Sequence, residues 1–301
     1  MKKLSAFSAM IMASVFFLDA QQPVIVTDDS LMFGNSRLPA LAVTIPEVSY
    51  ETSLREWIKQ LETGTKSKVV TENGEMSIFG AIIKNITENP VNVYSRFDNA
   101  DTLLRLIVAF EPKKDQYIER SVFDLEYSRA REYLFNFSKT LYMGLVKEQL
   151  QAEENRLRTM QKELGSLEKN EARLGKTMRK SEKTLQTERE RLIVYNNEMT
   201  SVSAAIIEHN NQLASMQAGD ARDEKESYIK ELEKNRKKVL KSVKKSENKI
   251  SKAERAIKNA ERALPKNDST QGRTRDLISG QEAIVQQYAD KLNTISSSVL
   301  R

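Results

Sequence analysis

The residue types that most often do chemistry in proteins are scarce in this chain. Its 301 residues include a single histidine, His209, and no cysteine. Thiol nucleophiles, thiolate metal sites and disulfides are therefore excluded, and one imidazole argues against a multi-histidine zinc site. The motifs GxGxxG, GxxxxGK[ST], HExxH and GxSxG are also missing. We predict no catalytic residues, no metal ligands, no cofactor and no enzymatic activity.

The remaining polar candidates have simpler structural interpretations. The 42 Asp and Glu residues leave open a carboxylate pair of the glycosidase type. Most of them, however, lie in highly charged segments beside residues of opposite charge. His209 falls in a heptad seam, where we interpret it as a polar seam residue rather than a metal ligand or pH switch. Trp57, the only tryptophan, lies on an apolar helix stripe and is interpreted as a core anchor rather than a stacking platform.

One cluster of charge could form a binding surface. Residues 225–266 contain 15 Lys+Arg and 6 Asp+Glu. The closest-set lysines are Lys237, Lys238, Lys241, Lys244 and Lys245. They are either a solvated outer helix face or a contact for an anionic partner, such as an envelope surface or an acidic protein. No aromatic residues are interleaved with them for base stacking, so we do not expect nucleic acid as a partner.

The elements that position these residues begin with a targeting segment. Lys2 and Lys3 precede an apolar run over residues 6–18, and Ala20 offers a cleavage site. This pattern predicts a secretory signal peptide over residues 1–20. A membrane anchor is the alternative, but the run is shorter than the roughly 20 residues that a spanning helix needs. We expect a protein that is exported to the periplasm or beyond and is soluble after cleavage near Ala20, with no transmembrane segment in the mature chain.

A small α+β head is predicted next. Residues 21–36 have a loop-like composition and are assigned to an N-terminal extended segment, and residues 37–117 to the head itself. Within the head we expect a strand around Val43 and a helix that Ser49 caps and Gly64 ends. Asn73-Gly74 predicts a hairpin, residues 98–101 a second hairpin turn, and residues 103–110 a strand buried on both faces. The expected order is β-α-β-β-β-β, with the Trp57 helix on one face of an antiparallel sheet.

The rest of the chain is predicted to be helical. Of all residues 30% are charged and 39% hydrophobic, with only 10 Gly and 6 Pro, as is typical of long helices. An aromatic-rich stripe from Tyr127 to Leu141 should pack on the head. Apolar residues then recur in heptads, which indicates a coiled coil. The heptad positions are Leu150, Leu157, Leu164, Met178, Leu185, Leu192, Met199, Ile206 and Leu213, with Met160, Leu167, Leu174, Tyr195, Val202 and Met216 three residues later.

The boundaries of these helices are set by breaks in the pattern. We predict a long helix over residues 118–217, a tip turn over 218–221 and a second coiled-coil helix over 222–264. Pro265 and the polar residues after it predict a loop over 265–275, followed by a C-terminal helix over 276–301. That last helix either returns along residues 139–163 or packs on helix 222–264. The fold class is α+β: an antiparallel-sheet head with one packed helix, then an antiparallel α-helical coiled-coil hairpin with a third C-terminal helix.

The arrangement of these parts is similar to that of a group of proteins. The N-terminal signal, the strand "VNVYSRF" and the tail that starts "LVKEQLQAEENRLRTMQKELGSLEKNEARL" resemble uncharacterised exported coiled-coil proteins of Bacteroidota. The resemblance covers most of the mature chain and implies no activity and no functional residues.

The function expected from these features is interaction rather than catalysis. We expect a structural or adaptor protein of the cell envelope, whose coiled-coil arm and head bind protein partners. One alternative is a holdase chaperone with a basic helical arm, similar in general design to the Skp family; another is a head that binds a small ligand. The heptads serve an intrachain hairpin and self-association equally well, so the sequence leaves the oligomeric state open.

Overall fold

The structure of the protein is a computed structural model, which describes residues 23–100 and 103–300. The predicted signal peptide, residues 1–20, lies outside the described residues. The chain divides into two units, which are described separately. The head unit is Met1–Leu157 with Gly280–Arg301, and the hairpin unit is Arg158–Ser279. The head unit is therefore larger than the predicted 37–117, because it includes the first part of the long helix and the C-terminal residues.

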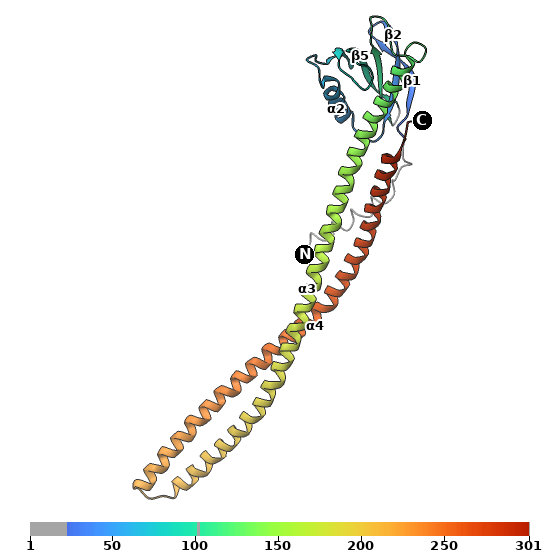
Figure 1. Cartoon of the computed structure of the whole chain (residues 1–301). Coiled ribbons are helices and arrows are strands. Elements are labelled where there is room, and N and C mark those ends of the chain that lie inside the picture. The colour runs from blue at the N-terminus through green and yellow to red at the C-terminus, as the bar shows by residue number, and fades with distance from the viewer. Residues whose placement is uncertain (1–22, 101–102, 301) are drawn as a thin grey trace. The chain divides into compact units, whose positions relative to one another are not determined.

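The head unit contains an antiparallel sheet, as predicted, but the sheet has six strands rather than the five expected (Figure 1). Its spatial order is β1-β2-β6-β5-β4-β3. The strands are β1 Val26–Phe33, β2 Ser36–Ile45, β3 Val70–Glu72, β4 Glu75–Ala81, β5 Val91–Ala100 and β6 Leu103–Glu111. The assignment of residues 21–36 to an extended segment outside the head was wrong, because β1 pairs along its whole length with β2. Gly34, at φ 55°, forms the turn between them.

The local turn and cap signals of the head are confirmed. Asn73 and Gly74 both have positive φ, 51° and 80°, at the turn between β3 and β4. The Ser49 hydroxyl accepts a hydrogen bond from the Thr52 backbone N–H, so Ser49 caps α2 Tyr50–Glu62. The predicted turn over 98–101 was wrong for residues 98–100, which belong to β5 and pair with β6, and residue 101 lies outside the described residues.

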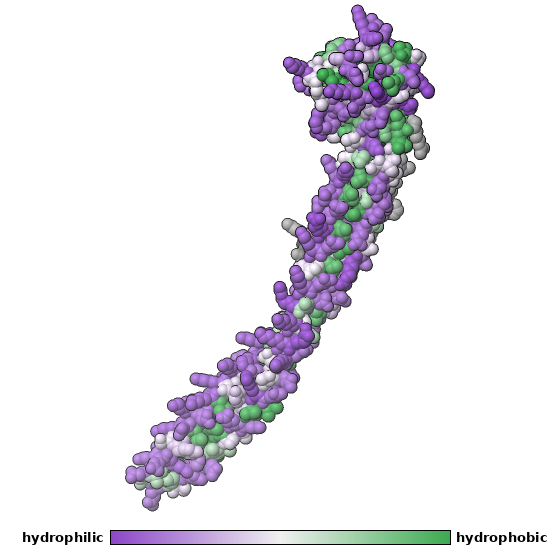
Figure 2. Space-filling view, viewed as in Figure 1, coloured by the Kyte–Doolittle hydropathy of each residue, from purple (hydrophilic) through white to green (hydrophobic). Residues whose placement is uncertain are grey.

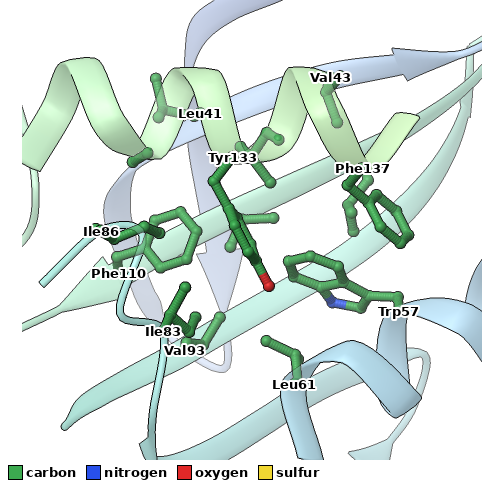
Figure 3. Packing of buried hydrophobic residues seen from close by; sticks show 14 of the residues in the cluster. Leu41, Val43, Trp57, Leu61, Ile83, Ile86, Val93, Phe110, Tyr133 and Phe137 are labelled. Atoms are coloured by element: carbon green, nitrogen blue, oxygen red, sulfur yellow. The ribbon is translucent and has the colours of Figure 1, made fainter. Parts of the chain in front are cut away.

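The core lies between one face of the sheet and two helices, α2 and the start of α3 Asp124–Ala214. Trp57 of α2 is fully buried, and its ring meets Phe137 of α3 edge-on at 5.0 Å and lies 6.2 Å from that of Tyr133 (Figure 3). The indole N–H donates a 2.9 Å hydrogen bond to the Ser95 hydroxyl on β5. Trp57 is thus a core anchor, and the prediction that the aromatic stripe packs on the head is confirmed.

The first long helix begins later than predicted. Residues 118–123 are not part of it, because the Ile118 N–H donates to the Phe110 carbonyl oxygen of β6 and the chain then turns. α3 therefore starts at Asp124 rather than at residue 118, and it ends at Ala214. A short turn that includes Gly219, at φ 153°, leads into α4 Asp220–Ser297.

The predicted loop over 265–275 does not exist. α4 continues through Pro265 to Ser297, so helix 222–264 and helix 276–301 are one element. The sequence predicted a loop because the side chains that continue the buried seam beyond Leu264 are polar. They are Asn267, Gln271, Thr274 and Gln281. The last turns of α4 return along α3 within the head unit, as the first of the two alternatives predicted. There Lys139 donates 2.7 and 2.8 Å hydrogen bonds to the carbonyl oxygens of Ser296 and Ser298.

Candidate functional site

The hairpin unit holds the candidate site, and its register decides which side chains face outward. The Asn267 amide of α4 donates to the Leu167 carbonyl oxygen of α3 at 3.0 Å. Towards the tip, Ser246 of α4 donates to the Glu188 carboxylate of α3 at 2.9 Å. Both helices advance by 21 residues between these contacts, which is three heptads with no insertion on either side.

Apolar heptad residues of both helices fill the seam between them. Met160, Val202 and Ile206 of α3 are buried, and so are Ile229, Val239, Ala253 and Ala260 of α4. The two helices run side by side in the hairpin unit (Figure 1). The sequence did not decide whether the seam pairs within one chain or between chains. In the structure, it pairs within one chain.

One ion pair is built into the seam. Glu188 is almost fully buried and accepts hydrogen bonds from Lys249 at 2.6 Å, Arg191 at 2.8 Å and Ser246 at 2.9 Å. The Lys249 ammonium and the Ser246 hydroxyl outweigh the effect of burial and lower the pKa of the Glu188 carboxyl. Such a polar layer disfavours shifted pairings of the two helices, since any shift leaves a buried charge without partners.

The single histidine lies near the tip of the same seam. The His209 ring stands edge-on to Tyr228 of α4 at 5.0 Å, and its Nδ1 lies 3.2 Å from the Gln212 side-chain oxygen. These are contacts of a polar seam residue, as the sequence interpretation held. In the described part of the chain, no group of three or more His, Cys, Asp or Glu residues is placed to hold a metal ion.

The five predicted lysines lie together on the outer face of α4. In a coiled coil the b, c and f heptad positions point away from the partner helix. Lys237 and Lys244 occupy b positions, Lys238 and Lys245 c positions, and Lys241 an f position, counted from the seam residues Val239 and Val243. All five are exposed, and none of them forms an ion pair among residues 23–100 and 103–300.

The structure extends this cluster into a longer surface that sequence reasoning missed. The b, c and f positions from Lys237 to Lys266 are 14 in number, of which ten are Lys or Arg and none is Asp or Glu. We call these ten residues the basic face. They are Lys237, Lys238, Lys241, Lys244, Lys245, Lys252, Arg255, Lys258, Arg262 and Lys266, and all ten are exposed. At 1.5 Å per residue the basic face is about 43 Å long. The sequence could have revealed this surface if heptad positions had been assigned to every residue as far as Arg262 and Lys266.

The acidic residues of the same stretch are kept off the basic face. Glu247, Glu254 and Glu261 recur at seven-residue spacing in the e positions, which flank the seam. Glu254 pairs there with Arg189 of α3 at 3.1 Å. Between Lys237 and Lys266, α4 therefore keeps its three glutamates beside the seam and leaves an outward surface of one sign.

The head unit offers a second polar cluster and a shallow groove. Glu111 is buried on β6 and accepts hydrogen bonds from the Asn92 amide, the Tyr94 hydroxyl and the Asp115 backbone N–H. Burial opposes ionisation, but these donors outweigh it and lower the pKa of Glu111, while burial and the carboxylate raise the pKa of Tyr94 to about 12. An open groove beside α2 is lined by residues such as Gln60. The cluster is internally satisfied, and the groove is open to solvent.

The comparisons with known proteins add little. No protein-family model matches the sequence, and the comparison with curated proteins finds no significant match. Among solved structures, the chain is similar to the Smc head domain with a coiled coil and joint derived from Pyrococcus yayanosii, with a TM-score of 0.29 and 14% identity. The match covers 73% of this chain and 54% of that one, so the chain spans about half the length of that structure. At this TM-score the similarity supports no conclusion about fold or function.

No helix in the described part of the chain combines the length and the hydrophobicity that a membrane crossing needs. The hairpin surface is instead mainly hydrophilic, with small hydrophobic patches (Figure 2). The protein is a coiled-coil protein with an α+β head, and the basic face is its most distinctive surface.

Proposed function

We propose that this protein is an exported, non-enzymatic adaptor of the cell envelope, which binds protein partners through its head and its coiled-coil hairpin. The observation that carries the proposal is the constant register of the hairpin. Because the seam closes within one chain, a single copy presents a long helical surface without needing a second copy. Residues 158–214 of α3 alone correspond to about 85 Å of helix. A hairpin of this kind bridges distance and offers side chains along its length.

An exposed aromatic pair supports a role in binding. On the head, Phe79 is 58% exposed and its ring lies 6.1 Å from that of Tyr94, so an aromatic pair is available to a partner. The compartment rests on the signal-peptide pattern and on the resemblance to exported coiled-coil proteins of Bacteroidota. Neither of these implies a reaction, which is why the proposal is an adaptor.

The proposal is tested by photo-crosslinking in the native cell. A photoreactive amino acid replaces Phe79 in the head or Ile207 in the hairpin, which are 58% and 62% exposed. The adaptor proposal predicts covalent protein adducts of different mass from the two positions, both in the envelope fraction. The same variants without irradiation are the control. Absence of adducts from both positions, or recovery of the chain from the cytosol, would refute the proposal.

A holdase chaperone is the second candidate, and one feature of α3 favours it. Ile193, Val194 and Ile207 are 62–63% exposed, in a segment, residues 192–219, that contains no Lys or Arg. Exposed aliphatic side chains of this kind can hold an unfolded client. The test is suppression of the aggregation of an unfolded outer-membrane protein at equimolar concentration. Replacing all three residues with serine should abolish suppression, and a wild-type protein that fails to suppress aggregation rules this candidate out.

A further inference from the structure

We infer that the basic face of α4 is a docking surface for an anionic lipid bilayer. The face consists of the ten exposed Lys and Arg residues between Lys237 and Lys266. The inference deepens the proposed envelope function and rests on it for the compartment. It assigns a partner surface to residues that the adaptor proposal leaves without one.

The geometry of the basic face fits a flat surface. The ten cations occupy only the b, c and f positions of α4, so they follow one side of the helix, opposite the seam. They extend for about 43 Å, with on average one cation every 4–5 Å. A flat, extended surface can meet all of them at once. A globular partner whose surface curves away over that length can meet only part of them.

The composition of the basic face fits lipid headgroups better than a protein partner. Protein–protein interfaces are enriched in aromatic residues, Met and Arg at their centres and depleted in Lys. The basic face has eight lysines and two arginines, Arg255 and Arg262. The other four b, c and f positions of the same stretch are Asn248, Ser251, Asn259 and Pro265. It therefore lacks the apolar centre that a protein partner would cover. A lipid surface needs no such centre, because its headgroups stay hydrated and each nearby Lys or Arg contributes on its own.

Charges of opposite sign lie on different sides of α4. The carboxylates of this stretch lie in e positions beside the seam, where Glu254 pairs with Arg189. They are thus held away from the surface that would approach the bilayer. A solvated face with no partner gains nothing from such sorting, since mixed charges on a helix surface stabilise it through i,i+4 pairs. A face that must approach anionic phosphates does gain from it.

The principal experiment is co-sedimentation of the full mature chain with vesicles. We expect binding to vesicles of 70% phosphatidylcholine and 30% phosphatidylglycerol at 0.1 M NaCl. No binding is expected to pure phosphatidylcholine, nor to either vesicle at 0.5 M NaCl, where charges are screened within a few ångströms. Each lysine near an anionic surface strengthens binding by about fivefold. The quadruple variant K237E/K241E/K244E/K245E should therefore bind at least about 100-fold more weakly.

The hairpin provides a matched control for this variant. Lys169, Lys176, Lys180 and Lys183 are exposed and lie in c and f positions of α3, on the opposite edge of the two-helix ribbon. Their replacement by Glu changes the net charge by the same amount. Because a flat surface can meet only one edge, this variant should lose less than about tenfold. Equal losses in the two variants would mean attraction by net charge alone and would overturn the inference. Circular dichroism of both variants confirms that they are folded.

A second measurement locates the contact directly. The chain has no cysteine, so single-cysteine variants can be labelled with an environment-sensitive fluorophore without background. Asn248 is an exposed f position on the basic face, and Gln186 is an exposed b position on the outer edge of α3 in the same layer of the hairpin. Addition of anionic vesicles should change the fluorescence at residue 248 and not at 186. An equal response at both positions overturns the inference.

Further outcomes distinguish a lipid bilayer from a soluble polyanion as the partner, and they test the bilayer inference separately from the adaptor proposal. Tighter binding to a duplex DNA or to a poly-glutamate peptide than to the vesicles, at equal salt, would reassign the face to a soluble polyanion. If the chain does not bind vesicles but forms photo-adducts at Phe79 and Ile207, the bilayer inference is rejected and the adaptor proposal stands. If it binds vesicles but forms no photo-adducts, the bilayer inference stands and the adaptor proposal is rejected.

Discussion

Replacing Pro265 with alanine should stabilise the middle of α4. Pro265 lies inside the helix at an exposed b position, so its ring contributes little to packing. A proline in a helix interior costs about 3 kcal/mol relative to alanine, through the lost N–H and the clash with the carbonyl four residues earlier, here that of Glu261. Proline also restricts the unfolded chain, which offsets roughly 0.4–1 kcal/mol of that cost. The net gain for Pro265→Ala is therefore about 2 kcal/mol.

The measurement is native-state amide hydrogen exchange of the full chain, read by mass spectrometry over residues 258–272. A gain of about 2 kcal/mol corresponds to roughly 30-fold slower exchange there. Ser269→Ala is the control, because Ser269 is an exposed f position one turn further along α4. Its gain in helix propensity is about 0.5 kcal/mol, or roughly twofold in rate. If Pro265→Ala slows exchange no more than Ser269→Ala, residues 265–275 are the loop that the sequence predicted, and the continuous helix is refuted.

Three further predictions concern single residues. Gly272→Ala should raise the thermal stability of the hairpin by about 1 kcal/mol, since an added Cβ meets no heavy atom within 4 Å; a lower melting temperature would show that the glycine serves a contact. Trp57→Phe should destabilise the head by roughly 2–3 kcal/mol in urea unfolding followed by circular dichroism, because it leaves the buried Ser95 hydroxyl unpaired; a cost below about 1 kcal/mol would contradict this. The pKa of Tyr94, about 12 in the folded head, lies above its unfolded value near 10. The corresponding stability is complete below pH 10 and is lost as the pH rises from 10 to 12, and a Tyr94→Phe variant with an unchanged alkaline unfolding profile would refute that assignment.

Most of the fold could be predicted from short sequence patterns. The Asn73-Gly74 turn and the Ser49 cap each depend on neighbours within a few residues, so the sequence alone predicts them. The same holds for the heptads between Leu150 and Leu264, because a seam of aliphatic residues repeats every turn or two. These elements sufficed to predict an antiparallel-sheet head and a helical hairpin.

The errors arose where distant partners decide the structure. β1 begins with polar residues that look loop-like, but Asp28 accepts a hydrogen bond from Tyr127 and Asp29 pairs with Arg105. Neither partner is close in sequence, so no local pattern identifies the strand. The seam beyond Leu264 was missed for a similar reason. Asn267 and Gln271 break the apolar pattern, yet each is buried because α3 supplies a matching acceptor.

The candidate site was only half visible for a related reason. The five lysines from Lys237 to Lys245 stand out by density alone. The rest of the basic face, from Lys252 to Lys266, is less obvious in the linear sequence, because Glu254 and Glu261 lie among its basic residues. The two signs separate only when residues are assigned to heptad positions, and Lys266 joins the basic face only when the seam is continued through Pro265.

The unbroken register of the hairpin also limits how its length can change over evolution. A deletion of a few residues in α3 alone would move every later α3 side chain past its partner on α4, and Glu188 would lose Ser246 and Lys249 together. A whole heptad lost from both helices at the same height would leave all remaining pairs intact. Each such paired event would shorten the hairpin by about 10 Å. Among homologous chains, length differences in this region should therefore be multiples of seven residues, equal in α3 and α4. The length of the hairpin should thus vary in steps of one heptad.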